Sequence, residues 1–165
     1  MVEMGEYLVG AYLKLILDCE ILTYNQKLSE KQGEFDVLGI DVNHNIVYIC
    51  EVITHIRGVL YGKSYKDTMN KIERKFKSNI KYAERIFPQY KKIYMLWSPV
   101  VPKGQMTKWL KSLPERLNKN NDEIKIIINE EYTKKTNELR AKAKKDTKDR
   151  GEPFYRALQI LEHMR

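Results

Sequence analysis

The pattern of hydrophobic and polar positions predicts a helix, three consecutive strands and a second helix in the first half of the chain. Apolar residues recur at helical spacing in Val2–Leu17 and again in Lys66–Phe87, where Pro88 ends the pattern. Three short apolar segments lie between the two helices: Ile21–Leu28, Gly33–Asp41 and Ile46–Thr54. Their length and their β-branched residues favour strands. A turn at Ser29–Gln32 and a glycine-containing loop at Ile56–Tyr65 complete this half.

The second half of the chain continues the alternation of strands and helices. We expect strands at 92–97 and 124–128, a helix at 103–117 that Pro114 can kink, and a short helix at 154–164. The lysine-rich segment 130–150 has few apolar anchors, and 133–150 is the best candidate for an exposed or mobile element. The whole pattern predicts an α/β fold of one domain, with a core over 1–129 and a C-terminal helical extension over 130–165 packed on it.

Two carboxylates interrupt the apolar strands of the expected hairpin. If Asp41 pairs with Ile46 across the turn, Asp36 lies directly opposite Glu51, on the same face of the sheet. Like charges facing each other destabilise a strand pair, and burying both costs several kcal/mol. A cation between them, usually a divalent metal, would offset this cost. The pair therefore indicates a functional site.

The composition is that of an ordered protein of a reducing compartment. The chain is 42% hydrophobic, and no apolar stretch reaches the roughly 20 residues that a membrane helix needs. Two cysteines, Cys19 and Cys50, do not form a disulfide framework, and the N-terminus does not resemble a signal peptide. We expect a cytoplasmic, intracellular protein without a membrane partner, and a homodimer is compatible with the sequence.

The net charge of +8 is distributed unevenly along the chain. Residues 1–60 carry a net −5, residues 61–111 carry +10 and residues 112–165 carry +3. An acidic segment followed by a basic one suits a polyanionic substrate, with acids holding metal and bases holding phosphates. A basic surface that serves only solubility is an equally open interpretation.

The order αβββαβ, with an acid on the second strand and another on the third, resembles the PD-(D/E)XK phosphodiesterase superfamily. The resemblance covers about Val2–Trp97. Its motifs are Gly33-Glu34-Phe35-Asp36 and Tyr48-Ile49-Cys50-Glu51-Val52, which look most like the Holliday-junction-resolvase and RecB-like branches. It implies a restriction-endonuclease-like core, in which a mixed central sheet is flanked by helices.

The resemblance also implies a metal site. Asp36 and Glu51 would be the metal-binding carboxylates, and the carbonyl oxygen of Val52 would be a third ligand. Oxygen ligands suit Mg²⁺ or Mn²⁺, which activates water and offsets charge on the scissile phosphate. Glu6 matches a first-helix glutamate that reaches the metal in several branches. It can equally be an ordinary acid near a helix N-terminus.

The family's lysine is missing, because Ile53 stands two residues after Glu51. That lysine orients or activates the attacking water. If Leu28 pairs with Glu34, Gln26 lies beside Asp36 and can position water. His55 shares the face of Glu51 and can act as a base, although a histidine at a strand end is more often merely exposed. Further candidates are a migrated ammonium from Lys63, Lys66 or Lys71, and Glu34 as an extra ligand.

The predicted helix 66–87 is the expected nucleic-acid surface. It carries seven basic residues against three acidic ones, and the first candidates for phosphate contacts are Lys66, Lys71, Arg74 and Lys75. Three aromatic residues can stack on bases, although the last of them suits the core better: Tyr61, Tyr65 and Trp109.

The sequence thus predicts metal-dependent hydrolysis of phosphodiester bonds in nucleic acid, with DNA as the expected substrate. A catalytically inactive binding or assembly module of the same fold is the alternative, because the motif lysine is absent. A basic protein that binds another protein is a third. Scattered histidines disfavour a zinc site, and the chain has neither a glycine-rich phosphate loop nor a serine in a nucleophile elbow.

Overall fold

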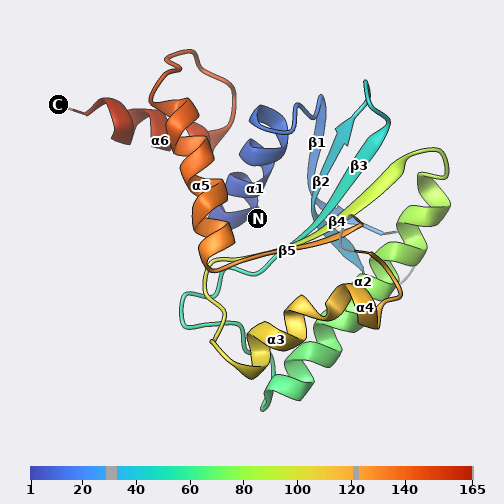
Figure 1. The fold of residues 1–165 in the computed structure, drawn as a ribbon. Helices are drawn as coiled ribbons and strands as arrows, with labels where there is room; N and C mark the ends of the chain where they lie inside the picture. The colour runs from blue at the N-terminus through green and yellow to red at the C-terminus, as the bar shows by residue number, and fades with distance from the viewer. Residues whose placement is uncertain (29–32, 121–122, 165) are drawn as a thin grey trace.

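The fold is that of an α/β protein with one five-stranded sheet between helices (Figure 1). The structure is a computed structural model that describes residues 1–28, 33–120 and 123–164. The strands are β1 (Ile21–Lys27), β2 (Glu34–Asp41), β3 (Ile46–Val52), β4 (Lys91–Ser98) and β5 (Ile124–Ile128). The helices are α1 (Met4–Leu15), α2 (Tyr65–Ile86), α3 (Gln105–Lys111), α4 (Leu113–Arg116), α5 (Glu130–Ala143) and α6 (Pro153–His163). The predicted turn at Ser29–Gln32 lies outside the described residues.

The strands lie in chain order across the sheet, β1-β2-β3-β4-β5. β1, β2 and β3 form an antiparallel meander, whereas β4 and β5 run parallel to β3. The parallel steps need long crossovers, which α2 provides between β3 and β4, and α3 with α4 between β4 and β5. The sheet is therefore mixed, as predicted.

The predicted register of the β2–β3 hairpin is confirmed, but that of β1 and β2 is wrong by one residue. Asp41 pairs with Ile46, as expected. Lys27, not Leu28, pairs with Glu34, so Gln26 pairs with Phe35 and does not flank Asp36. The reason is that Leu28 donates its N–H to Gly33 and packs its side chain into the core beneath α2. A shift of one residue moves every side chain of a strand to the other face.

Each face of the sheet is covered by its own helices. α1, α5 and α6 lie on one side, and α2, α3 and α4 lie on the other (Figure 1). The two cores are apolar and closely packed, with Trp97 fully buried beside Tyr12 in the first and Phe35 fully buried with Phe76 in the second. β2 and β3 are covered on both faces, which fits their nearly continuous apolar sequences.

Helix α2 begins and ends where the sequence provides the signals. The side chain of Ser64 caps it by accepting the N–H of Asp67, and Pro88 follows its last turn. The helix predicted at 103–117 is divided into α3 and α4 at Ser112. Pro114 lies in the first turn of α4, where its missing N–H leaves no hydrogen bond unmade.

The C-terminal helices share the core of α1. Three α5 side chains are buried in that core, those of Tyr132, Leu139 and Ala143. The hydroxyl of Tyr12 on α1 donates to Glu138 on α5 at 2.7 Å. The first part of the segment 133–150, which was predicted to be exposed or mobile, thus belongs to α5, and α5 buries its few apolar residues. No helix in the described part of the chain is long and apolar enough to cross a membrane.

Candidate active site

The two acidic residues singled out by the sequence lie together at one end of the β2–β3 hairpin. The confirmed register places Asp36 opposite Glu51, one position beyond the Val37–Cys50 pair. Each residue is only 5% exposed, so both carboxylates are buried. Their burial requires a positive partner.

That positive partner is Lys75, which extends from α2 to both acids. Its Nζ atom lies 3.0 Å from Oδ1 of Asp36 and 2.5 Å from Oε1 of Glu51. Burial opposes the charge on Lys75, but the two carboxylates outweigh this effect and raise the pKa of its ammonium. The side chain of Lys75 is 31% exposed, so it remains partly accessible to solvent while it pairs with both acids.

The remaining carboxylate oxygens differ in their partners. Oδ2 of Asp36 accepts the backbone N–H of Val52 at 2.8 Å, which fixes the orientation of this carboxylate against β3. Oε2 of Glu51 is buried and has no hydrogen-bond partner among the described residues. Burial and the nearby charge of Asp36 raise the pKa of Glu51 to about 8. An orphaned carboxylate oxygen in a buried acid pair is a feature that a cation would satisfy.

A cavity of about 250 Å³ surrounds the acid pair. Its lining combines acidic, aromatic and backbone groups: Glu3, Glu6, Asp36, Glu51, Val52, Ile53, Thr54, His55, Tyr61 and Lys75. Val52, expected to supply a carbonyl ligand, is thus adjacent to both acids. His55 is exposed, and its ring packs edge-on against Tyr61 with 5.4 Å between ring centres.

Glu6 also lines this cavity, but its carboxylate is engaged in local hydrogen bonds. Its Oε2 accepts the backbone N–H of Glu3 at 2.8 Å and the side-chain amide of Asn25 at 3.0 Å. The described residues contain no group of three or more His, Cys, Asp or Glu side chains arranged to hold one ion. Glu6 is the third residue of α1, and its carboxylate forms a capping box with the N-cap residue Glu3.

One further residue, Gln26, is not at the position that the sequence predicted. Gln26 is exposed, and its amide donates to the carbonyl of Lys27, because the β1–β2 register differs by one residue. Asn25, with a φ of +50°, takes the place opposite Asp36 by register and points its amide to Glu6. Asparagine tolerates this left-handed conformation better than most residues.

Ile53, at the position of the missing motif lysine, is a core residue. Its side chain is 1% exposed and packs with Phe35, Met69 and Ile72. Ile53 also lines the acid cavity, so it lies between the apolar core and the acid pair. The amine that reaches the acids comes instead from α2.

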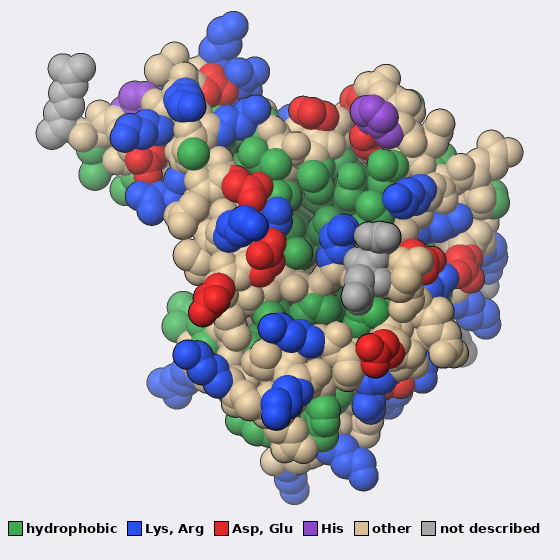
Figure 2. Space-filling view, viewed as in Figure 1, with side chains coloured by type: hydrophobic (Ala, Val, Ile, Leu, Met, Phe, Trp, Pro, Cys, Tyr) green, Lys and Arg blue, Asp and Glu red, His purple; other side chains and the backbone are tan. Residues whose placement is uncertain are grey.

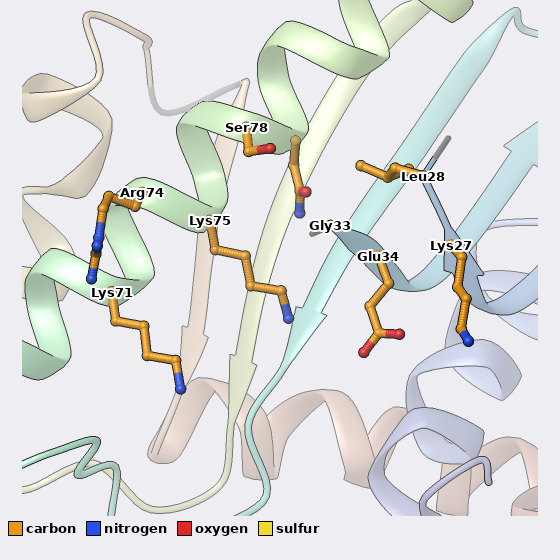
Figure 3. Close-up of a pocket in the computed structure, with 9 residues that line it drawn as sticks. Lys27, Leu28, Gly33, Glu34, Lys71, Arg74, Lys75 and Ser78 are labelled. Carbon is orange, nitrogen blue, oxygen red and sulfur yellow. The ribbon is translucent and has the colours of Figure 1, made fainter. Parts of the chain in front are cut away.

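A second, larger cleft of about 710 Å³ adjoins the acid cavity. It is lined by Lys27, Leu28, Gly33, Glu34, Lys71, Arg74, Lys75, Ser78 and Asn79. Figure 3 shows Lys71, Arg74 and Lys75 extending from α2, with Lys27 and Glu34 on the opposite side. Glu34, considered as an extra ligand, thus lines this cleft.

The basic residues expected on α2 separate into two groups. Lys71, Arg74 and Lys75 line the cleft, and the Lys71 amine also lies 4.3 Å from the ring centre of Tyr61. Lys66 is exposed in the first turn and lines neither the cleft nor the acid cavity. Lys and Arg side chains also gather over α2 and α3 in the space-filling view (Figure 2).

The sequence predicted phosphate contacts for Lys75, whereas in the structure its amine forms ion pairs with Asp36 and Glu51. One signal was available, because Lys75 lies about 60° from Ile72, at the edge of the apolar arc of α2. Thr68 and Asn79 occupy the same edge, and both are buried. Buried polar residues at the edge of the apolar face of a helix indicate that a long side chain there can extend along the core to a polar site.

Comparison of the chain with protein-family models, with curated proteins and with solved structures gave no match.

Proposed function

We propose that the protein is a metal-dependent phosphodiesterase that cleaves nucleic acid, with DNA as the substrate. The observation that carries the proposal is the buried Asp36–Glu51 pair, which is bridged by Lys75 and has one carboxylate oxygen without a partner. Two acids and one lysine around a small cavity are the groups that metal-dependent phosphodiester hydrolysis requires.

The arrangement of elements supports a restriction-endonuclease-like core. α1, the β1–β3 meander, α2 and β4 follow the αβββαβ order, and the acids lie on the second and third strands. This order and these positions are those of the PD-(D/E)XK superfamily, which the sequence resembles. The likeness rests on the element order and on the two acids.

The residues around the cavity suit Mg²⁺ or Mn²⁺. Asp36, Glu51 and the carbonyl oxygen of Val52 would hold the ion, since hard divalent cations prefer carboxylate and carbonyl oxygens. When bound, such an ion lowers the pKa of a coordinated water and offsets negative charge on the phosphate. Oε2 of Glu51 would gain the partner that it lacks.

Lys75 would take the place of the lysine that is missing at Ile53. Its ammonium reaches the same carboxylates from α2 and would donate hydrogen bonds to the attacking water or to a phosphate oxygen. The side chain is long enough to serve this role from the helix because α2 packs directly over β2 and β3. Ile53 can then remain a core residue without loss of the positive charge.

The adjoining basic cleft supports a polyanionic substrate. Among the residues that the structure describes, Lys27, Lys71 and Arg74 line it beside one acid, Glu34. Contacts of Lys and Arg with phosphates are largely independent of sequence and sensitive to salt. Cys19 and Cys50 are free and buried, which suits action inside the cell, where thiols remain reduced.

The ion pairs of Lys75 with Asp36 and Glu51 also favour a second function, that of a nucleic-acid-binding module without catalytic activity. Lys75 forms an ion pair with each acid in the absence of metal, so the three residues can serve as a structural link between α2 and the sheet. Such a module would use the same basic cleft.

A cleavage assay separates the two functions. With Mg²⁺ or Mn²⁺, the native protein should cleave members of a panel of single-stranded, duplex and branched DNA, and E51Q and D36N should abolish cleavage. E115Q, which changes an exposed acid on α4, is the matched control and should retain full activity. Absence of cleavage across DNA and RNA substrates with both metals, together with retained binding, would establish the module instead.

A further inference from the structure

Lys75 belongs to two neighbouring cavities. It lines the acid cavity, where its amine contacts Asp36 and Glu51, and it also lines the basic cleft with Lys71 and Arg74. Of the described residues, Lys75 is the one that the two linings have in common. It therefore links the acid cavity, where the proposed metal would bind, to the basic cleft, where a phosphate of the substrate would bind.

The Lys75 amine and a divalent ion would compete for the same space. Mg²⁺ binds carboxylate oxygens at about 2.0–2.1 Å, so an ion shared by Asp36 and Glu51 would lie where the Lys75 amine now contacts both. Two cations at such a short distance repel strongly in a buried site. Metal binding between the acids therefore requires the amine to move.

The charge in the basic cleft controls whether the Lys75 amine can move from the acids into the cleft. Without a ligand, Lys27, Lys71 and Arg74 surround the cleft with positive charge and oppose the entry of a fourth cation. Glu34 offsets only part of this charge. A phosphate in the cleft reverses the balance, because the Lys75 ammonium then finds an anion there. Its flexible four-carbon stem allows the change without movement of α2.

We infer that a phosphate group of the nucleic-acid strand in the basic cleft draws the Lys75 ammonium away from Asp36 and Glu51 and thereby admits the divalent metal between them. The inference rests on the proposed function and adds a form of regulation, in which substrate and metal bind cooperatively. The metal is bound weakly until a strand lies in the cleft. This would keep the free protein from loading metal without substrate.

The coupling is measured by titrating Mn²⁺ into the full-length protein with and without a single-stranded phosphorothioate oligodeoxynucleotide. This probe keeps one negative charge per linkage and resists hydrolysis, so binding is measured apart from cleavage. The Kd for Mn²⁺ should fall at least tenfold when the oligonucleotide is saturating. Because coupling is reciprocal, the Kd for the oligonucleotide should fall by the same factor when Mn²⁺ is saturating.

Variants separate the part played by Lys75 from direct attraction between metal and phosphate. K75M should bind Mn²⁺ at least tenfold more tightly than the native protein without oligonucleotide, and its coupling factor should fall at least threefold. K81M, an exposed lysine of α2 outside both cavities, is the control and should behave like the native protein. The double variant K71Q and R74Q keeps Lys75 but removes two charges that oppose its entry into the cleft, so it should weaken oligonucleotide binding and tighten Mn²⁺ binding in the absence of oligonucleotide.

The Mn²⁺ titrations distinguish failure of the inference from failure of the proposed function. Equal or weaker Mn²⁺ binding by folded K75M would overturn the inference, as would an unchanged coupling factor, while cleavage by the native protein would still support the proposed function. If K75M does not fold, a native Mn²⁺ Kd that is independent of the oligonucleotide overturns the inference by itself. A native protein that binds no Mn²⁺ in either condition would overturn both proposals.

Discussion

The amine of Lys75 on α2 lies 2.5 Å from the carboxylate of Glu51 on β3. The two residues are 24 positions apart in the chain and meet because α2 packs across the sheet after a long connection. This ion pair offsets part of the cost of burying two acids, and in the proposed phosphodiesterase it would supply the lysine that position 53 lacks.

The metal-free protein should lose stability as the pH rises from 5 to 8. The pKa of Glu51 is about 8 in the folded protein against an ordinary value of 4.5, so the folded state keeps a proton that the unfolded chain has released. One pKa unit corresponds to about 1.4 kcal/mol, which limits the loss to about 5 kcal/mol.

Urea unfolding at pH 5, 6, 7 and 8 with a chelator present measures this loss. E51Q removes the titrating group and should flatten the profile. Acids with a lowered pKa, such as Glu73 and Asp146, titrate below this window and leave it unaffected. A native protein that becomes more stable toward pH 8 would contradict the prediction.

K75M should reduce Mg²⁺-dependent cleavage by about 10²–10⁴-fold, since a positioned proton donor contributes this much to catalysis. It should also lower the free energy of unfolding of the metal-free protein by about 1–3 kcal/mol, because two buried acids lose a partner. Cleavage assays and urea unfolding measure the two effects. K81M should change neither, and full activity of K75M would assign the lysine a purely structural role.

I53K should destabilise the protein by at least about 2 kcal/mol and should not increase cleavage. The side chain of Ile53 is 1% exposed among Phe35 and Met69 and also lines the acid cavity, so lysine would disturb the core packing and bring a second amine beside that of Lys75. Urea unfolding measures the change, and I53V is the matched control, with an expected loss of about 0.5–1.5 kcal/mol. A stable I53K protein with faster cleavage would mean that the motif position is still open to lysine.

K71A combined with R74A should weaken DNA binding and reduce its salt dependence. Each lost phosphate contact lowers the slope of log K against log salt by about 1, so the pair should lower it by about 2. K134A combined with K142A removes two exposed lysines of α5, on the other side of the sheet, and should leave the slope unchanged. The opposite result would place the DNA surface on α5.

The sequence alone determined the order of the elements, the α/β class and the position of the acid pair. These features depend on local patterns: helical spacing in α2, apolar runs in β2 and β3, and a short hairpin turn that sets Asp41 against Ile46. Because strand pairing across a short turn has few alternatives, the placement of Asp36 opposite Glu51 followed from the chain itself.

Only the tertiary structure decided the register of β1 and the origin of the lysine. The connection between β1 and β2 is longer and does not fix the pairing, so the packing of Leu28 beneath α2 selects Asn25 rather than Gln26 for the place opposite Asp36. Seven basic residues of α2 look alike in the sequence. The packing of α2 on the sheet brings Lys75, and not Lys66 or Lys71, to the acids, and this packing depends on contacts between residues far apart in the chain.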